Sequence, residues 1–401
     1  MARRVPRTEW LDAVRWRFGH APVVAILGPR QIGKSTLAAE FAKTWQGPVH
    51  RFDLERADDV RRLTDEWVAV EHLKGLVVID EVQRRPEIFP MLRVLADRDG
   101  PPARFLVLGS ASRDLLRQTS ESLAGRISYL ELGGLGVSEV GVRNFPRLWL
   151  RGGFPRSYLA ADDAHSMAWR HEFIRTFLER DLPQFRPQIS SVTMDRFWHM
   201  LAHWHGQTWS GSDFARNFGV GDHAVRRYLD FLTDMLVIRQ LRPWHENLAK
   251  RQVKAPKVYV ADTGLLHALL GIETEVDLER HAQVGASWEW FAIDAVVRRL
   301  GARPDQCWFW ATHASAALDL LVTSGDRRLG FEIKRTVAPE VTRSMHVAKS
   351  DLKLDSLDVI HAGRETWSMK DGVRAVAFSR ILEDIAPLAA GKGSRRRTPS
   401  A

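Results

Sequence analysis

The feature that most constrains this chain is the segment Gly28-Pro-Arg-Gln-Ile-Gly-Lys-Ser35, which fits the pattern G-x-x-x-x-G-K-[ST] without a mismatch. The apolar run 23–28 before it has no polar alternation, which is typical of a buried strand, and the stretch after it has helical character. A strand, a glycine-bearing turn and a helix in this order predict the first unit of a parallel α/β sheet.

The two glycines of this segment let the backbone curl so that several N–H groups point at one phosphate chain, and the following helix adds its positive end. Lys34 can reach the β- and γ-phosphates, and the Ser35 hydroxyl can ligate Mg²⁺. We therefore predict ATP and Mg²⁺ as ligands. The residues predicted to bind the nucleotide are Gly28, Pro29, Arg30, Gln31, Ile32, Gly33, Lys34, Ser35 and Thr36.

A second motif, Leu76-Val-Val-Ile-Asp80-Glu81, ends a buried strand in two carboxylates. In a phosphate-binding fold Asp80 would hold Mg²⁺ through water, and Glu81 would orient and polarise the attacking water. The alternative is an acidic strand end that only caps the next turn. Ser110 ends the following strand and could lie between the two carboxylates and the γ-phosphate, although a plain strand-end turn explains it almost as well.

The chain has 401 residues, more than one ordinary hydrophobic core, so several domains are expected. Strands at 23–28, 49–55, 75–81 and 104–110 alternate with helical stretches and predict a parallel sheet within residues 1–145. Residues 146–275, the middle segment, are predicted to be helical with a winged helix. Residues 276–388 are predicted to form a C-terminal α/β domain, and residues 389–401 a basic disordered tail.

Within the middle segment, residues 210–241 predict a short helix, a Gly-Val-Gly turn, a longer helix and a strand, the outline of a helix-turn-helix with a wing. His223, Arg226 and Arg227 would point outward from the second helix, where arginines can meet phosphates or guanine edges. Asp222 and Asp230 interrupt this positive face. Contact with DNA and a packing or lid role both stay open.

The C-terminal part carries Asp319, Glu332 and Lys334 in the spacing D-x12-E-x-K. Glu332 and Lys334 are two residues apart on a predicted strand, so they project from the same face, and Asp319 lies on the preceding strand of the hairpin. Together with Glu289 on the opening helix, the carboxylates could hold Mg²⁺ while the lysine positions water. A solvated hairpin or an inactive remnant is the alternative.

Composition excludes several classes. The formal net charge is +9, but Arg3, Arg4, Arg7, Lys392, Arg395, Arg396 and Arg397 supply seven positive charges from the two ends, which leaves the body near +2. The basic balance is therefore weak evidence for nucleic acid. Cys307 is the only cysteine, which excludes an intramolecular disulfide and a cysteine zinc cluster. No apolar run approaches the ~18 residues of a membrane span, so we expect a cytoplasmic protein without a membrane partner.

These motifs, with Leu-Gly-Ser-Ala-Ser (108–112), Glu-Ser-Leu-Ala-Gly-Arg126, Leu-Arg-Gly-Gly-Phe-Pro155, Glu-Arg-Asp181, Lys-Val-Tyr-Val-Ala-Asp-Thr-Gly264 and Phe-Glu-Ile-Lys334, resemble the prokaryotic AAA-type ATPases with a C-terminal domain of unknown function. The resemblance runs from about Trp10 to Ile381. It implies a P-loop core with an additional strand, a winged helix and a restriction-nuclease-like C-terminal fold. Within that fold, Asp319, Glu332 and Lys334 resemble the D…E-x-K residues of restriction-like nucleases.

In such ATPases an arginine from the same or a neighbouring subunit often completes the site. Arg126 matches the family motif, and the resemblance implies that it stabilises charge on the γ-phosphate; Arg30 is a second candidate. Sites of this kind usually form between subunits, so a homo-oligomer is expected. The predicted function is an ATP-hydrolysing motor or switch. The alternatives are an ATP-gated binding module with little turnover and an ATP-regulated nuclease; the sequence leaves open whether the partner is a nucleic acid or a protein.

Overall fold

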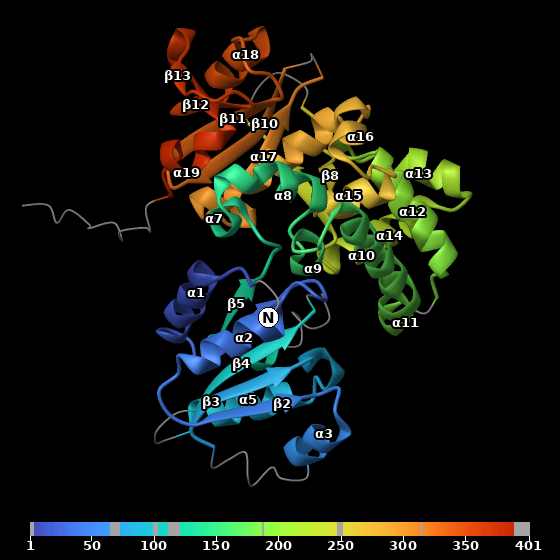
Figure 1. Cartoon of the computed structure of the whole chain (residues 1–401), viewed down its shortest axis with the longest axis vertical. Helices are drawn as coiled ribbons and strands as arrows, with labels where there is room; N and C mark the ends of the chain where they lie inside the picture. Colours follow the sequence, from blue (N-terminus) through green and yellow to red (C-terminus); the bar gives the residue numbers. More distant parts are fainter. Residues whose placement is uncertain are drawn as a thin grey trace, which may run out of the picture.

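The computed structural model describes residues 4–64, 73–98, 103–110, 121–186, 188–246, 252–313 and 316–388. The predicted tail 389–401 lies outside these residues. An α/β unit formed by the N-terminal part (blue to cyan) occupies one end of the molecule, and the C-terminal sheet (orange to red) occupies the other (Figure 1). Among the described residues, no helix combines the length and the apolar character needed to cross a bilayer.

The N-terminal unit contains a parallel sheet in the order β2-β3-β4-β1-β5. Its strands are β1 (Val23–Leu27), β2 (Val49–Asp53), β3 (Gly75–Asp80), β4 (Ala103–Gly109) and β5 (Ile127–Glu131). The four strands predicted from apolar runs are confirmed. The edge strand β5 was missed because its five residues include polar ones and are mostly half-buried, so they lack a continuous apolar run.

Helices cover both faces of this sheet, because alternate residues of each strand point to opposite sides. Val24 and Ile26 of β1 pack in one core with α1 (Thr8–Phe18) and α2 (Lys34–Lys43), whereas Val23 and Ala25 pack in another with α5 (Ile88–Asp97). The short helix α3 (Ala57–Thr64) follows β2. Two covered faces explain why the strands read as continuous apolar runs.

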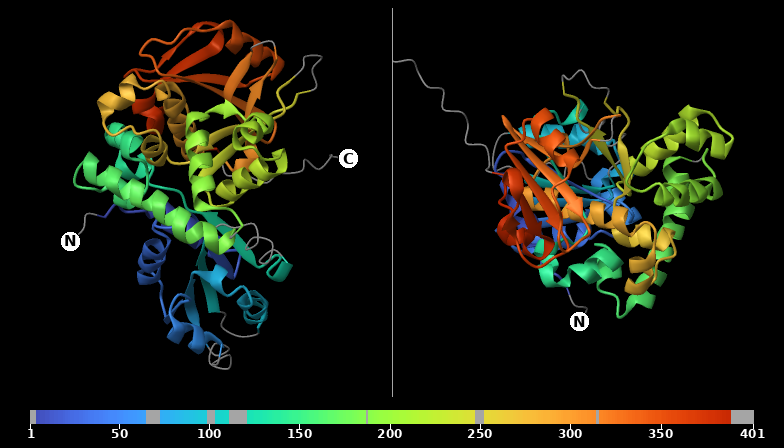
Figure 2. Two further views of the ribbon diagram at one scale, coloured as in Figure 1. Left: turned by 90° about the vertical axis from the view of Figure 1, so that its right-hand side faces the viewer. Right: turned by 90° about the horizontal axis from the view of Figure 1, so that it is seen from above.

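The middle segment is built mainly from helices. They are α7 (Val137–Val140), η2 (Val142–Asn144), α8 (Phe145–Arg151), α9 (Pro155–Tyr158), α10 (Asp163–Thr176), the π-helical η3 (Phe177–Asp181), α11 (Leu182–Phe185), α12 (Ser191–His203), α13 (Gly211–Phe218) and α14 (Asp222–Asp234). The core of the segment is continuous with the α2 side of the N-terminal sheet. The left view of Figure 2 shows green helices lying between the N-terminal unit and the C-terminal sheet.

Helices α13 and α14 form the predicted pair around a tight turn. Val225 is buried, whereas His223, Arg226 and Arg227 are exposed, as expected from the sequence. Arg226 pairs with Asp230 at 3.2 Å, so part of its charge is neutralised along the helix. Three antiparallel strands adjoin this pair: β6 (Gln207–Thr208), β7 (Ile238–Pro243) and β8 (Lys257–Val260).

The C-terminal part contains a mixed sheet. Its elements are α15 (Thr263–Leu269), α16 (Glu275–Arg280), α17 (Val284–Leu300), η4 (Pro304–Gln306), β9 (Cys307–Ala311), β10 (Ala317–Ser324), β11 (Arg327–Lys334), α18 (Arg343–Asp351), β12 (Ser356–His361), β13 (Trp367–Ser368), η5 (Lys370–Gly372), β14 (Val373–Ala377), η6 (Phe378–Arg380) and α19 (Ile381–Asp384). The opening helix and the β10–β11 hairpin match the prediction, and β14 was missed.

One sheet of nine strands joins the middle and C-terminal segments, in the order β13-β14-β12-β11-β10-β9-β7-β8-β6. The junction is a parallel pairing of β7 with β9, in which Arg242 lies beside Trp308 and Pro243 beside Phe309. The boundary predicted between residues 275 and 276 is therefore crossed by a continuous hydrogen-bonded sheet. Sequence patterns did not indicate this pairing, because its two strands are separated by the whole of α15–α17.

Glycines allow two segments, the loop after α8 and the start of α15, to meet at one point. The Asp262 carboxylate accepts hydrogen bonds from the backbone N–H of Gly153 (2.7 Å) and of Leu265 (3.0 Å), so it caps α15 and holds the loop after α8. A Cβ at Gly152 would lie 2.1 Å from Asp262 Oδ1, and a Cβ at Gly264 would lie 2.1 Å from the carbonyl oxygen of Arg151. Side chains at these two positions would push the segments apart.

We expect Gly264→Ala to lower the free energy of unfolding by about 1 to 3 kcal/mol, because the added methyl group overlaps backbone that has no room to retreat. Chemical denaturation followed by circular dichroism would measure the loss. The control is Gly285→Ala, a helical position where a Cβ meets nothing within 4 Å. It should be neutral or stabilising, so an equal loss in both variants would contradict the packing argument.

Candidate functional site

The loop between β1 and α2 has the shape that the motif predicts. Gln31 (φ 60°) and Gly33 (φ 101°) adopt left-handed backbone conformations that turn the chain. A Cβ at Gly28 would lie 2.6 Å from the carbonyl oxygen of Leu132, so only glycine fits there. No side chain caps the N-terminus of α2. Its first N–H groups have no partner within the helix, and they suit an anion such as a phosphate.

Lys34 is held inside this loop. Its residue is 6% exposed, and its Nζ donates to the carbonyl oxygens of Gly28 and Pro29, both at 2.9 Å. Burial lowers the pKa of Lys34 to about 8, although the carboxylates of Glu81 and Asp80 act to raise it. The ammonium group is therefore poorly hydrated, and a phosphate bound beside it would stabilise its positive charge. Ser35 and Thr36 remain exposed at the same helix end.

The two carboxylates follow β3, which is separated from β1 by β4 alone. Asp80 is the last residue of the strand, and its Oδ1 accepts a hydrogen bond from the backbone N–H of Glu81 at 2.9 Å. Glu81 has a left-handed backbone (φ 54°), which is strained for a residue with a side chain. Because parallel strands all end at one edge of the sheet, these carboxylates lie near Lys34.

Gln83 connects Glu81 with the next strand, a role that was not predicted although this residue directly follows the Asp80-Glu81-Val82 segment of the motif. It lies in the short helix η1 (Val82–Arg84); its Nε2 donates to Glu81 Oε2, and its Oε1 accepts from the backbone N–H of Ser110 at 3.3 Å. Ser110 is 2% exposed, and its Oγ has no hydrogen-bond partner among the described residues. Ser110 is thus linked to Glu81 through Gln83, and its position between the carboxylates and a γ-phosphate stays a prediction. Ser112 of the same motif lies outside the described residues.

Arg30 points away from the loop toward the middle segment. Its Nε lies 3.0 Å from Asp181 Oδ1, and its Nη2 lies 3.9 Å from Glu81 Oε2. The Asp181 side chain is 3% exposed, and burial raises its pKa. Asp181 ends the π-helical turn η3, a kind of irregularity that is frequent at functional sites. The Glu-Arg-Asp motif therefore connects the helical segment with Glu81 through the Arg30 guanidinium.

Arg126 is not brought to this site within one chain. It precedes β5, and its carbonyl oxygen accepts from the backbone N–H of Val23, the first residue of β1. It therefore lies at the opposite end of the sheet from the loop, which follows the last residue of β1. Its exposed side chain pairs with Asp97 at 2.5 Å. Any contact of Arg126 with a nucleotide would have to be made on a neighbouring copy of the chain.

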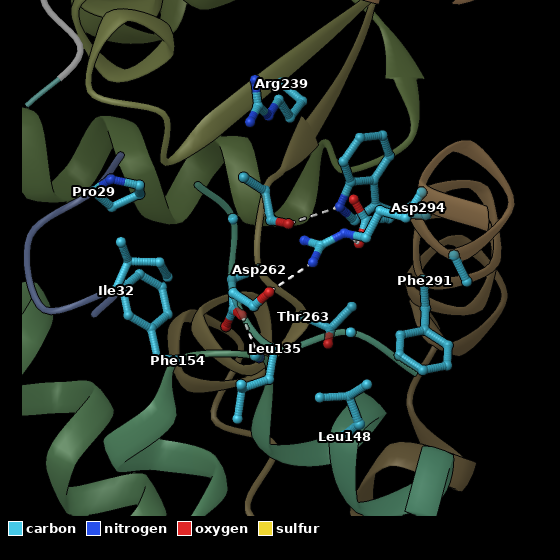
Figure 3. A pocket seen from close by; sticks show the side chains of 18 of the residues that line it. Pro29, Ile32, Leu135, Leu148, Phe154, Arg239, Asp262, Thr263, Phe291 and Asp294 are labelled. Atoms are coloured by element: carbon cyan, nitrogen blue, oxygen red, sulfur yellow. Dashed lines mark hydrogen bonds and ion pairs between the residues drawn. The ribbon is translucent and has the colours of Figure 1, made fainter. Parts of the chain in front are cut away.

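A cavity behind the loop is shared by all three parts of the chain (Figure 3). Pro29 and Ile32 of the loop line one side, and Asp262 and Phe291 line others. Arg7 closes the rim: it donates to the carbonyl oxygens of Ile32 (3.3 Å) and Gly133 (3.0 Å) and pairs with Glu139 at 2.6 Å. A displacement of the loop would therefore disturb the contacts of Arg7 with Gly133 and Glu139, which belong to the chain that leads from β5 into the middle segment.

The C-terminal carboxylates also come together. Glu289 Oε1 accepts from Lys257 Nζ at 2.9 Å and from the Tyr259 hydroxyl at 2.6 Å, and Lys257 Nζ lies 3.6 Å from Asp319 Oδ1. Burial by itself lowers the pKa of Lys257, but Glu289 and Asp319 outweigh it and raise this pKa to about 12. Lys257 and Tyr259 were not predicted as part of the constellation, because they belong to the strand β8 of the middle segment.

The other half of this cluster is Glu332 with Lys334. Lys334 Nζ donates to Glu332 Oε1 at 2.7 Å. Burial and the neighbouring Asp319 raise the pKa of Glu332 to about 7. The four residues predicted from D-x12-E-x-K and α17 are thus assembled. In the described part of the chain, however, no three histidine, cysteine or acidic side chains are arranged to hold a metal ion.

Three family models together match most of the chain, from residue 20 to residue 381. An AAA domain matches residues 20–141, a domain of unknown function (DUF8612) matches residues 142–276, and another (DUF4143) matches residues 284–381. The uncharacterized proteins Rv2008c of Mycobacterium tuberculosis and Mb2031c of Mycobacterium bovis are each 48% identical over 378 residues, which covers 94% of this chain and 85% of the relative. The chain belongs to their family. Its N-terminal part is an AAA-type P-loop ATPase domain.

Among solved structures, the Walker-type ATPase PABY2304 of Pyrococcus abyssi is similar, with 16% identity, a TM-score of 0.47, and coverage of 67% of this chain and 96% of that chain. The RuvB Holliday junction branch migration motor of Thermotoga maritima is 17% identical with a TM-score of 0.30, covering 59% of this chain and 90% of that chain. Both scores are low, and they add nothing to the family assignment.

The state of Lys34 predicts a pH-dependent stability. The unfolded chain titrates near the ordinary value of 10.5 and the folded chain near 8, so protonation below pH 8 costs folding free energy. In the nucleotide-free protein, Lys34→Met should therefore raise stability at pH 7 by about 1 to 3 kcal/mol. This gain should shrink as the pH rises from 8 toward 10.5.

Thermal unfolding of both proteins across this pH range measures the effect. The control is Lys43→Met, an exposed lysine at the end of the same helix, for which the difference from the unmodified chain should not change over the same pH range. A Lys34→Met variant that unfolds more readily than the parent at pH 7 would contradict the interpretation.

Proposed function

We propose that this protein is a Mg²⁺-dependent ATPase in which Glu81 activates the attacking water. The observation that carries the proposal is the placement of the Asp80–Glu81 pair one strand away from the loop that holds Lys34. The residues fit a bound nucleotide. The loop is shaped by glycine, and within the described part of the chain the buried Lys34 ammonium has no ion pair with a carboxylate and the Ser110 hydroxyl has no hydrogen-bond partner.

Each residue then has a task. The N–H groups at the start of α2 and Lys34 would bind the phosphate chain, and Ser35 with Asp80 would hold Mg²⁺, which supplies charge neutralisation at the phosphates. Glu81 would accept a proton from water, and Gln83 would fix its orientation through the hydrogen bond to Oε2. Ser110 can donate its free hydroxyl toward the phosphate end.

We also propose that nucleotide turnover is coupled to the helical segment through Arg30. This side chain lies between Asp181 of η3 and Glu81, so it contacts the moving part and the chemical centre at once. Added negative charge of a γ-phosphate beside the loop would compete with Asp181 for the guanidinium. Release of that ion pair would free η3 and α10 from the loop, which gives ATP a way to act as a switch.

A second candidate, an ATP-gated contact with DNA, is favoured by one observation: His223, Arg226 and Arg227 remain exposed on α14, the second helix of the helix-turn-helix. A protein partner, with α14 serving only for packing, remains the alternative. An ATP-regulated nuclease would instead require the cluster around Asp319 and Glu332 to take up a metal ion.

The central test is the turnover of Glu81→Gln. We expect phosphate release to fall by about 10²-fold or more, because the general base is removed while the loop is unchanged. Binding of a fluorescent ATP analogue should stay near that of the unmodified protein. Lys34→Ala should lose the binding as well. Gln83→Leu should bind ATP normally and turn over more slowly, as expected of a positioning residue.

Glu87→Gln, an exposed position six residues further on, is the matched control and should behave as the parent. Equal turnover in Glu81→Gln and in the parent would refute the proposal. Measuring the same rates with and without duplex DNA separates the partner classes: stimulation by DNA that is lost in Arg226→Ala/Arg227→Ala favours nucleic acid, and indifference favours a protein partner.

We further propose that the active form is a homo-oligomer in which Arg126 of one copy completes the site of the next. Arg126→Ala should abolish turnover without weakening binding of the ATP analogue. A mixture of Arg126→Ala and Glu81→Gln proteins should regain activity, because some interfaces would combine an intact Glu81 with an intact Arg126. Asp97→Ala separates a role in the Arg126–Asp97 pair from this one, since it should remain active.

Arg143→Ala, an exposed arginine nearby in the sequence, serves as a control and should not change the rate. If the mixture stays inactive while each parent variant still assembles by light scattering, Arg126 does not act between copies.

A further inference from the structure

The C-terminal carboxylate cluster contains a cation that belongs to the protein itself. Lys257 Nζ lies 2.9 Å from Glu289 Oε1 and 3.6 Å from Asp319 Oδ1, between two of the three carboxylates that a metal ion would use. Its side chain is only 16% exposed, and its ammonium lies 5.7 Å from the centre of the Phe309 ring. The group is therefore fixed within the cluster, where its charge offsets the carboxylates.

An unpaired oxygen marks the remaining part of the cluster. Glu332 is 6% exposed, and its Oε1 accepts from Lys334, but its buried Oε2 has no hydrogen-bond partner among the residues that the structure describes. Leu320 pairs with Phe331 across the hairpin, so Asp319 and Glu332 come next to each other along the same ladder. A buried carboxylate oxygen without a donor is costly, and it is the kind of ligand that a hard divalent cation takes.

We propose that Lys257 occupies the cation position of the cluster formed by Glu289, Asp319 and Glu332, and that a divalent metal ion binds there only when this lysine is withdrawn. Three carboxylates face two ammonium groups, Lys257 and Lys334, so little negative charge remains to attract a second cation. The arrangement differs from an open metal site, and it agrees with the lack of a metal-binding geometry among the described side chains.

The source of the lysine gives this arrangement a consequence. Lys257 begins β8, which pairs with β7 and β6 of the middle segment, whereas the carboxylates come from α17 and the β10–β11 hairpin. The cation and its acidic partners thus come from different segments of the chain, although β8, β10 and β11 share one sheet. As long as β8 lies beside α17, the Lys257 ammonium occupies the position at which a metal ion would bind.

Metal binding to the nucleotide-free full-length chain tests the proposal. Free Mn²⁺ is measured by electron paramagnetic resonance for the parent, for Lys257→Met and for Lys257→Met/Asp319→Asn. Lys257→Met should gain one saturable Mn²⁺ site with an affinity at least about tenfold above the parent, because a competing positive charge is removed. The double variant should lose that site. Lys257→Arg, which keeps the charge, and Lys254→Met, an exposed lysine three residues earlier, should resemble the parent.

Thermal unfolding provides an independent measurement. Lys257→Met should unfold at a lower temperature than the parent, and Mn²⁺ should restore part of the loss in this variant but not in the double variant. If Lys257→Met does not fold alone, refolding with Mn²⁺ decides: recovery absent from the double variant supports the proposal, and no recovery overturns it. A Mn²⁺ site already present in the parent and lost in Asp319→Asn would also overturn it.

Discussion

The parallel pairing of β1, β4 and β3 is the constraint on which the rest of the molecule depends. Because the three strands are parallel, their carboxyl ends lie at one edge of the sheet. The loop after β1, the Ser110 hydroxyl after β4 and the carboxylates of Asp80 and Glu81 at the end of β3 are therefore neighbours. The short helix after β3 then uses Gln83 to connect Glu81 with the end of β4. The strain at Glu81 is tolerated because the flanking strand is paired on both sides.

Communication out of this edge follows charged side chains. Arg30 leads from the loop to Asp181, and Arg7 leads from Ile32 to the chain that follows β5. Both guanidinium groups are largely shielded from solvent, where ion pairs are strong but costly to leave unpaired. Asp262 completes the set on the far side of the cavity by capping α15 and holding Gly153. A displacement of the phosphate loop would therefore alter two sets of contacts, those of Arg30 with Asp181 and those of Arg7 with Ile32 and Gly133.

Local signals carried the N-terminal prediction. Short strand-like stretches, most of them apolar runs, located four strands, and the G-x-x-x-x-G-K-S segment located the loop, because these patterns are determined by residues close in sequence. The half-buried edge strand β5 lacked such a run. The roles of Gln83 and Lys257 were missed for another reason. The role of Gln83 depends on the turn after β3, and that of Lys257 depends on contacts of β8 with residues far away in the sequence.

The same limit applies to Arg126 and to the second constellation. The motif placed Arg126 correctly after the fourth strand, but only the direction of the strands reveals that it lies at the far edge of the sheet. The spacing of Asp319, Glu332 and Lys334 correctly predicted a shared hairpin, and it could not indicate that an ammonium group from β8 fills the space between the carboxylates.

The pairing of β7 with β9 has a further consequence for the way this protein could be divided. Cutting the chain at the boundary between its second and third family models would strip a neighbour from each of two strands and leave their N–H and C=O groups bare. Each fragment would then expose an unpaired strand edge that can pair with the same edge of another copy of the fragment. The middle and C-terminal segments thus share one hydrogen-bonded sheet, although two family models divide them.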